Sequence, residues 1–309
     1  MPGDRKEGYF SKIRQEAKYK TIKGLHEAKN YPILVLCEIL LIVRSSYYKW
    51  LKHEETNEEK INHELSQLIL EYHDEFKGIL GYRRMTLWIN KRNQTNYNVK
   101  RIRRLMKKLG VSSVIRRVRK GYIKVRPEIT AENVLNRQFE ANNPNEKWLT
   151  DVTEFKVIGS NTKLYLSAII DLCDTSIISY KMGISNNNQL VNETFEKAFQ
   201  LNPEAKPMVH SDRGYQYTNK VFQKKLTSRS MTVSMSRVGR CIDNGPMESF
   251  WGTLKSEMYY LTQFHDINQL KVAIDQYIQF YNKQRYQEKL KGLTPMEFRN
   301  QALKIESVI

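Results

Sequence analysis

Three successive runs rich in β-branched and aromatic residues place the strongest constraint on the fold: Trp148–Val157, Lys163–Asp171 and Ser176–Met182. Short breaks at residues 159–161 and 174–175 separate them. Connections this short join antiparallel neighbours, because a parallel pair needs a crossover of a dozen or more residues. The runs therefore predict an antiparallel meander.

Helices and short strands alternate after the meander. Helical sequence is expected at Gln189–Gln200, Asn219–Thr227, Pro246–Tyr260 and Ile267–Lys283, and short strands at Pro207–Val209 and Met231–Met235. Two helices would thus close the chain. This order predicts an α/β fold, with a mixed sheet flanked by helices.

Helices are expected throughout the first 127 residues. Residues 31–50 have the size of a helix, a short turn and a second helix, which suits a helix–turn–helix and a plain helical hairpin equally well. Glu58–Tyr72 is amphipathic. Asn98 is a suitable N-cap for a further helix with apolar positions at helical spacing, and Gly110 is its stop signal.

These patterns divide the chain into four segments. We expect a helical unit at residues 1–55, a basic helical unit at 56–127, a polar linker at 128–145, and an α/β unit with a C-terminal helical tail at 146–309.

The net charge of +18 is concentrated in the first half of the chain. Residues 1–150 contain 31 Lys and Arg against 17 Asp and Glu, and residues 100–127 contain twelve basic residues and no acidic one. Such density favours binding of a polyanion over a merely solvated helix face. Nucleic acid is preferred to a membrane, because the stretch has a single aromatic residue, Tyr122. The expected DNA contacts here are Lys100, Arg101, Arg103, Arg104, Lys107, Lys108, Arg116 and Arg117.

The cysteines and the apolar runs indicate in which cellular compartment the protein is found. Cys37, Cys173 and Cys241 lack paired spacing, which favours a reducing environment without disulfides or structural zinc. The longest apolar run, Ile33–Val43, is too short to span a bilayer, and the first ten residues are polar. We expect a cytoplasmic protein without a membrane partner, associated with the nucleoid when bound to DNA.

Three acidic residues lie in separate short motifs: Asp151 in WLTDVTEF, Asp212 in HSDRGYQYT and Glu248 in DNGPMESFWGTLKSE. Alone, each could be a solvated strand residue, a turn residue or a first-turn helix carboxylate. Together, three carboxylates would form a hard-oxygen site for two Mg²⁺ ions, or Mn²⁺ in their place.

Glu248 and Lys255 fall on one face of the helix expected at Pro246–Tyr260, two turns apart. Gly252 lies between them and leaves room for a nucleic-acid backbone. A carboxylate and a cation in this arrangement could hold a metal ion and an adjacent phosphate.

The motifs resemble a DDE transposase with a retroviral-integrase-type catalytic core, and more closely the downstream-frame protein of the IS3 family of bacterial insertion sequences. The matching residues are Trp148, Asp151, Thr153, His210, Ser211, Asp212, Gly214, Tyr217, Ser236, Gly239, Asp243, Asn244, Glu248, Lys255, Tyr281, Asn282, Arg285, Leu290, Thr294 and Pro295, with GYRR at 81–84 and KRIRRLMKKLG at 100–110. The resemblance implies a ribonuclease-H-like fold with Asp151, Asp212 and Glu248 as metal-binding triad. It also implies a DNA contact at Lys255, and Arg83 and Arg84 of the GYRR motif are further expected DNA contacts.

The implied function is metal-dependent cleavage at the ends of an insertion sequence, followed by transfer of the exposed 3′-hydroxyl into DNA. Its partners would be the terminal inverted repeats, the target DNA, further copies of the chain and an upstream-frame protein. Two alternatives stay open: a catalytically silent DNA-binding regulator derived from a transposase, and a nuclease of the same fold that hydrolyses RNA–DNA hybrids.

One departure from the family lies just before the second helix expected in residues 31–50. Relatives carry Leu-Gly-Val-Ser where this chain has Leu40–Val43, so the tight turn and its serine cap are expected to be missing.

Overall fold

The computed structural model describes residues 15–115, 140–236 and 244–306, and the chain divides into two compact units, residues 1–65 and 66–309. Arg116, Arg117 and residues 128–139 of the expected linker lie outside the described residues. Within the described ranges, no helix is both long and apolar enough to cross a membrane.

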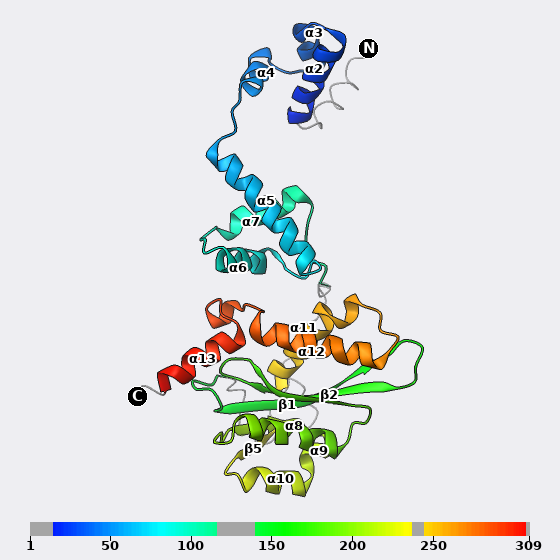
Figure 1. The fold of residues 1–309 in the computed structure, drawn as a ribbon, viewed down its shortest axis with the longest axis vertical. Coiled ribbons are helices and arrows are strands. Elements are labelled where there is room, and N and C mark those ends of the chain that lie inside the picture. Colours follow the sequence, from blue (N-terminus) through cyan, green and yellow to red (C-terminus); the bar gives the residue numbers. More distant parts are fainter. Residues whose placement is uncertain (1–14, 116–139, 237–243, 307–309) are drawn as a thin grey trace, which may run out of the picture. The chain divides into compact units, whose positions relative to one another are not determined.

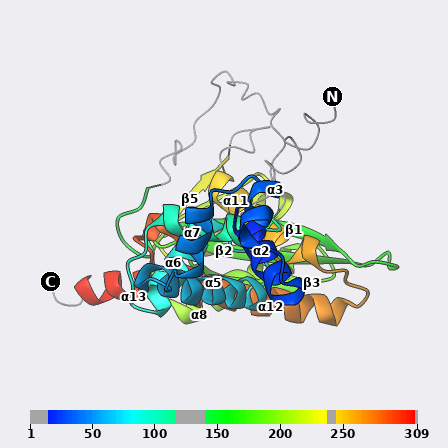
Figure 2. The same cartoon turned by 90° about the horizontal axis from the view of Figure 1, so that it is seen from above.

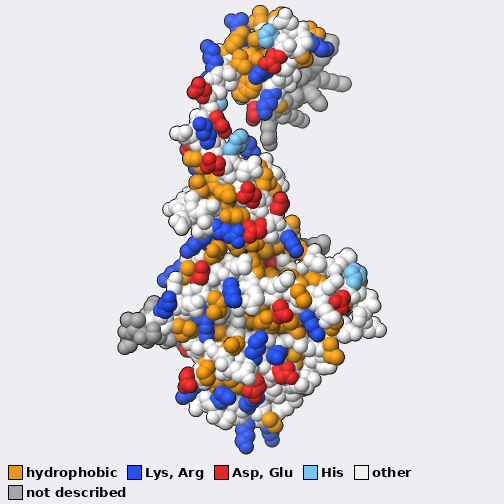
Figure 3. Space-filling model, viewed as in Figure 1, with side chains coloured by type: hydrophobic (Ala, Val, Ile, Leu, Met, Phe, Trp, Pro, Cys, Tyr) orange, Lys and Arg blue, Asp and Glu red, His pale blue; other side chains and the backbone are white. Residues whose placement is uncertain are grey.

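The first unit contains α2 (Gln15–Lys29), α3 (Ile33–Ile39), α4 (Arg44–Leu51) and the start of α5 (Asn57–Glu75). Its small core includes Ile22, Leu36 and Tyr47. Tyr19 stacks on Trp50 at 5.4 Å between ring centres. The two helices expected in residues 31–50 are confirmed, and apolar side chains also lie at the surface of this unit (Figure 3).

The turn between α3 and α4 corrects one expectation. Leu41 takes a left-handed backbone conformation, with φ of 54°. Its N–H bonds to Glu38 O at 3.2 Å and the N–H of Ile42 bonds to Cys37 O at 2.9 Å, a pair of bonds that usually ends a helix at glycine. The tight turn is therefore present without glycine. The serine cap is absent as expected, because Val43 at the N-cap makes no side-chain hydrogen bond.

Two further helices, α6 (Tyr82–Arg92) and α7 (Val99–Leu109), follow α5. As predicted for α7, the Asn98 side chain accepts a hydrogen bond from Lys100 N, and Gly110 ends the helix with φ of 73°. Helix α6 lies in the region expected to be helical, but its bounds were not predicted, although Met85, Trp88 and Ile89 are buried at helical spacing.

The second unit contains a five-stranded sheet in the order β3-β2-β1-β4-β5. Figure 1 shows this sheet with helices on both sides. The strands are β1 (Lys147–Lys156), β2 (Lys163–Asp171), β3 (Ile177–Gly183), β4 (Met208–Ser211) and β5 (Thr232–Met235). The first three pair antiparallel, so the predicted meander is confirmed. Strand β4 pairs parallel with β1, and β5 pairs parallel with β4.

Helices cover both faces of the sheet. They are α8 (Asn188–Leu201), α9 (Tyr215–Thr218), α10 (Lys220–Thr227), α11 (Gly245–Glu257), α12 (Ile267–Lys283) and α13 (Pro295–Glu306), with 3₁₀ turns at Tyr259–Leu261 and Glu288–Leu290. Figures 1 and 2 both show α13 at one end of the sheet. Two helices were expected to close the chain. The structure has a third, because α13 follows α12.

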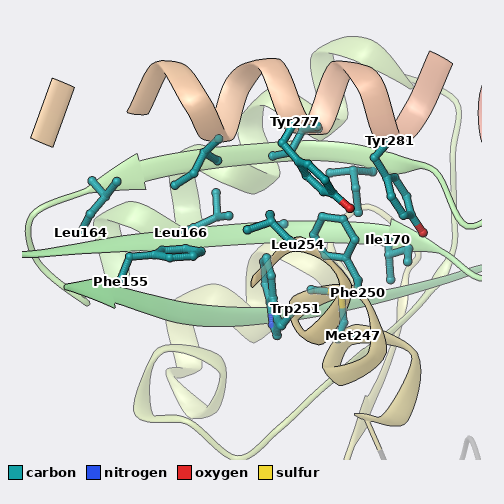
Figure 4. Packing of buried hydrophobic residues seen from close by; sticks show 14 of the residues in the cluster. Phe155, Leu164, Leu166, Ile170, Met247, Phe250, Trp251, Leu254, Tyr277 and Tyr281 are labelled. Atoms are coloured by element: carbon teal, nitrogen blue, oxygen red, sulfur yellow. The ribbon is translucent and has the colours of Figure 1, made fainter. Parts of the chain in front are cut away.

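Alternation along β1 divides the core between the two faces. Trp148 packs with residues of α8 and α10, whereas Leu149 packs with residues of α11 and α12. Figure 4 shows the second of these layers, with Trp251 and Leu254 of α11 beside strand residues such as Phe155. The mixed sheet between helical layers confirms the predicted α/β fold.

Candidate active site and nucleic-acid interface

Asp151 lies in the middle of β1, opposite Ala168 of β2. Its Oδ1 accepts a hydrogen bond from Val152 N at 2.8 Å, and its Oδ2 accepts one from Trp251 Nε1 at 3.0 Å. Burial raises the pKa of Asp151 to about 6; the charges of Asp212 and Glu248 add to the rise, and the two hydrogen bonds oppose it.

Asp212 follows the last residue of β4, the parallel neighbour of β1. Its Oδ1 accepts a hydrogen bond from Gly214 N at 2.9 Å. A Cβ atom at Gly214 would lie 3.0 Å from that oxygen and 2.8 Å from Oε1 of Gln216, so a side chain there would crowd the Asp212 carboxylate. The turn after β4 therefore fixes where this carboxylate lies.

Glu248 is exposed and lies in the first turn of α11, behind Pro246 near the helix start, as expected. Partial burial raises the pKa of Glu248 above its ordinary value. Its charge also reaches Asp151, which belongs to a different element.

The three carboxylates thus share one neighbourhood, because the charges of Asp212 and Glu248 both act on Asp151. They do not form a closed ligand set: within the described parts of the chain, no three His, Cys, Asp or Glu side chains are grouped closely enough to hold one metal ion. Like charges at close range repel, which opposes a closer approach of the three carboxylates unless a cation compensates them. The donor chemistry itself, three carboxylates, suits hard divalent cations.

A buried polar frame supports this neighbourhood. The hydroxyl of Thr150, the residue before Asp151, donates to Ala168 O at 3.0 Å and lies 3.2 Å from the hydroxyl of Tyr217. Burial, with the charge of Asp151, holds the pKa of Tyr217 well above its usual range. His210 lies between Ser234 and Ser236, with 2.9 Å and 3.1 Å from its ring nitrogens to the two hydroxyls.

Lys255 lies two turns beyond Glu248 on α11, with Nζ 5.3 Å from the centre of the Phe155 ring. Burial lowers the pKa of Lys255, while the charges of Glu154 and Asp151 oppose that shift. The cation is therefore held beside the carboxylates and against an aromatic face.

The basic side chains of α6 and α7 are mostly exposed. Arg83 and Arg103 both lie over the ring of Tyr82, at 5.8 and 5.1 Å, and Arg101 lies 5.7 Å from the ring of Tyr97. The exposed ones on α7 are Lys100, Arg103, Arg104, Lys107 and Lys108. Arg84 differs: its guanidinium contacts Glu257 of α11.

An open cavity of about 440 Å³ lies beside these helices. Arg83, Asn90 and Asn98 are among its lining residues, and Glu288 contributes an acidic side chain. Its charged lining residues are therefore of both signs, and they lie beside apolar ones such as Leu87 and Val99.

Sequence reasoning missed three partners in this unit. The spacing of Trp251 on its helix is that of a core residue, and its hydrogen bond to Asp151 was not anticipated. Glu257 and Arg299 were not singled out, although each is the centre of a buried ion-pair network. A buried charge without a partner is costly, so an acidic residue in an apolar helical stripe was the available signal for Glu257.

Comparison with known families gives matches over both halves of the chain. Residues 141–241 and 248–303 match the family descriptions of the integrase core domain, and residues 60–120 match that of an HTH-like domain. The fold and these matches define a ribonuclease-H-like integrase core preceded by a helical DNA-binding domain, as in polynucleotidyl transferases.

Similarity to individual proteins narrows the class. The transposase InsK of insertion sequence element IS150 from Escherichia coli is 42% identical over 284 residues, covering 91% of this chain and 98% of InsK. A 31 kDa protein of insertion element IS600 from Shigella sonnei is 32% identical, covering 85% of this chain and 97% of that protein. The transposase InsF of IS3A from E. coli is 26% identical, covering 90% and 97%. The chain belongs to the IS3 family of transposases, enzymes of DNA transposition and integration.

Solved structures similar to this chain include the HTLV-2 integrase catalytic core domain in its dimeric form with magnesium. That match has a TM-score of 0.40 and 22% sequence identity, and covers 51% of this chain and 97% of the integrase domain.

Proposed function

We propose that Asp151, Asp212 and Glu248 bind two Mg²⁺ ions, replaceable by Mn²⁺, and that this site cleaves DNA at the ends of the insertion sequence. The observation that supports the proposal best is the raised pKa of Asp151, to which burial and the charges of Asp212 and Glu248 contribute. A site that concentrates negative charge in this way stabilises divalent cations.

The proposed reaction has two steps at one site. In the first step, water attacks the phosphodiester at an element end, and the bond from phosphorus to O3′ breaks to free a 3′-hydroxyl. In the second, that hydroxyl attacks a phosphodiester of the target DNA and displaces the target's own 3′-oxygen. Bound metal ions supply activation of the attacking oxygen and stabilisation of the leaving oxygen. The three carboxylates would hold the metal ions, and Lys255 would contact a phosphate of the terminal DNA beside them.

Nicking of a labelled duplex carrying one element end tests the triad. Asp151→Asn, Asp212→Asn and Glu248→Gln should each abolish Mg²⁺-dependent product. Glu154→Gln is the matched control, because Glu154 lies on the same strand, is exposed and pairs with Lys163. Equal product from Asp212→Asn and the parent would contradict the enzyme and leave the silent DNA-binding protein as the better account.

We also propose that the basic side chains of residues 56–127 bind the DNA backbone. The set comprises Arg83, Arg84, Lys100, Arg101, Arg103, Arg104, Lys107, Lys108, Arg116 and Arg117. Counterion release predicts that each lost phosphate contact weakens binding on every sequence and reduces the slope of log K against log salt by about one. Lys107→Gln should do so, whereas Lys163→Gln, on the β1–β2 hairpin, should not. An unchanged salt slope for Lys107→Gln would show that Lys107 does not contact a phosphate.

The four-segment organisation, 1–55, 56–127, 128–145 and 146–309, belongs to the same proposal. Two element ends must be held together during transposition, so we expect a homo-oligomer on DNA, in association with the nucleoid, and an interaction with the upstream-frame protein. Analytical ultracentrifugation with end-containing duplex tests the oligomer, and a monomer at saturating DNA would contradict it.

A further inference from the structure

Helix α11 is tied to strand β1 by two hydrogen bonds on either side of Glu248. At the start of the helix, Asn244 Nδ2 donates to Thr150 O at 3.3 Å. Further along, Trp251 Nε1 donates to Asp151 Oδ2 at 3.0 Å. Adjacent residues of β1 therefore receive one bond each from the helix that carries Glu248.

Glu248 lies between these two anchors in the sequence. Glu248 and Trp251 are spaced i and i+3 on α11, and Asn244 caps the start of the helix. Glu248 is exposed, so it lies at the solvent edge of the face that contacts β1. Both Asn244 and Trp251 are buried, at 4% and 6% exposed, so water competes little for either bond.

The Asp151 carboxylate is oriented from two sides. Val152 N binds Oδ1 and Trp251 Nε1 binds Oδ2, so rotation about the carboxylate is opposed at both oxygens. A carboxylate oxygen has two lone-pair sites, so Oδ2 can accept the indole N–H and still bind a cation. Hydrogen-bonding groups behind a metal ligand orient it and tune its affinity.

We infer that Trp251 is a positioning residue of the active site: its indole N–H holds the Asp151 carboxylate in the orientation that lets Asp151 and Glu248 share one divalent cation. This inference rests on the proposed function of the three carboxylates. It assigns Trp251 a task beyond the packing visible in Figure 4, where its ring lies in the apolar layer between α11 and the strands.

Trp148 supplies a matched control. It lies three residues before Asp151 on β1, is fully buried, and its Nε1 has no hydrogen-bond partner within the described structure. Trp148→Phe and Trp251→Phe therefore remove the same atoms from two buried sites, and only the second removes a hydrogen bond to Asp151.

The test is the affinity of the full-length variants for Mn²⁺ alone, measured by electron paramagnetic resonance without DNA. Trp251→Phe should raise the dissociation constant by about 10- to 100-fold relative to the parent, as losses behind metal ligands do. Trp148→Phe should bind as the parent does. Thermal unfolding of both variants tests whether they remain folded. If the two lose the same amount of stability, a difference in Mn²⁺ affinity between them reflects the position of Asp151 and not lost packing.

A second measurement uses the parent protein, and so does not depend on the folding of a variant. With ¹⁵N-labelled tryptophan, the indole N–H resonance of Trp251 should shift on adding Mg²⁺, and that of Trp148 should not. The same shift should be absent in Asp151→Asn.

The outcomes distinguish this inference from the proposal beneath it. If the parent and Asp151→Asn bind Mn²⁺ equally, the proposed triad fails, and the role of Trp251 fails with it. If binding depends on Asp151 but Trp251→Phe equals Trp148→Phe, the triad stands and Trp251 is a packing residue only. Tighter Mn²⁺ binding by Trp251→Phe would also overturn the inference, because the indole would then compete with the cation.

Discussion

Arg84 of α6 and Glu257 at the end of α11 are 173 residues apart in the sequence, and their side chains form an ion pair with 2.6 Å between Nη1 and Oε1. Arg285 donates to both carboxylate oxygens of Glu257, at 3.0 and 2.8 Å, and the hydroxyl of Tyr277 donates to Oε2 at 3.0 Å. The Glu257 side chain is 1% exposed. Helix α11, which carries Glu248, is therefore joined directly to α6.

Replacing Glu257 should destabilise this unit strongly. In Glu257→Ala, the guanidiniums of Arg84 and Arg285 lose a buried partner, and breaking such a pair costs about 3–5 kcal/mol of unfolding free energy. Urea unfolding followed by tryptophan fluorescence measures the loss. Trp88 reports on this region, since its ring lies 6.3 Å from that of Phe280 and 4.9 Å from that of Tyr286.

The control for this prediction is an exposed pair. Glu154 and Lys163 are 2.9 Å apart with side chains 45% and 42% exposed, so Glu154→Ala should cost less than about 1 kcal/mol. Burial alone would raise the pKa of Glu257, but the hydrogen bonds and charges of Arg285 and Arg84 hold it below its ordinary value. The stabilisation by ionised Glu257 is thus fully present above its pKa in the unfolded chain. It disappears as pH falls through its pKa in the folded protein. A loss that is equal for Glu257→Ala and Glu154→Ala would contradict the network.

Local signals in the sequence sufficed for several elements. Asn98 and Gly110 bounded α7 at both ends, and the short breaks between β-rich runs fixed the antiparallel meander. These features depend on neighbouring residues, which a sequence displays directly. The left-handed turn at Leu41 was missed because the rule used there asks for glycine, whereas the buried helix ends imposed the turn on leucine.

Contacts between residues far apart in the sequence could not be predicted from these local signals. Nothing near Trp251 indicates that its N–H reaches Asp151, which lies 100 residues away, because its spacing matches that of an ordinary core residue. The partners of Arg299 are likewise 125 and 128 residues away. Periodicity shows which face of an element is buried and leaves open what that face meets.

Leu41 offers a stabilising substitution. A left-handed conformation costs a residue with a Cβ atom about 1–2 kcal/mol, and the Leu41 side chain is 58% exposed, so little packing is lost with it. Leu41→Gly should therefore increase the protection of α3 and α4 amides in native-state hydrogen exchange, by about 1 kcal/mol of opening free energy. Val43→Gly is the control, since Val43 is exposed and has φ of −68°. Equal or lower protection in Leu41→Gly would show that the turn is unstrained.

Arg299 should be essential for attaching α13 to the sheet. It is 5% exposed, and its Nη1 lies 2.9 Å from Asp171 Oδ2 and 2.8 Å from Asp174 Oδ2. Arg299→Ala leaves two buried carboxylates without a cation and should lower unfolding free energy by about 3–5 kcal/mol. Arg299→Lys keeps the charge but not the planar fork that reaches several partners, so it should recover only part of the loss in urea unfolding. Full recovery would show that charge alone matters.

Asp151 should make stability depend on pH in the opposite direction from Glu257. The pKa of Asp151 rises from 3.8 to about 6 in the folded protein, mainly through burial. Between these values the folded state holds a proton that the unfolded chain releases, so unfolding free energy falls as pH rises through this window. Asp151→Asn cannot ionise and should lack that component. Thermal midpoints of the parent and the variant at pH 4 to 7.5 give the two slopes, and their difference isolates Asp151 because Asp171, whose pKa is also about 6, is present in both proteins.

If Asp151 is a metal ligand, a divalent cation should offset the loss of stability that its ionisation causes. Above pH 6 the ionised Asp151 destabilises the fold, and a cation that binds only the folded state raises the midpoint by mass action. Mg²⁺ at pH 7.5 should therefore raise the thermal midpoint of the parent and leave that of Asp151→Asn unchanged, and the gain in the parent should shrink as pH falls below 6 and protons compete for the carboxylate. Ca²⁺ and a monovalent salt at matched ionic strength separate specific binding from screening of the +18 net charge. A gain of equal size in Asp151→Asn would assign the stabilisation to a different site and exclude Asp151 as a ligand.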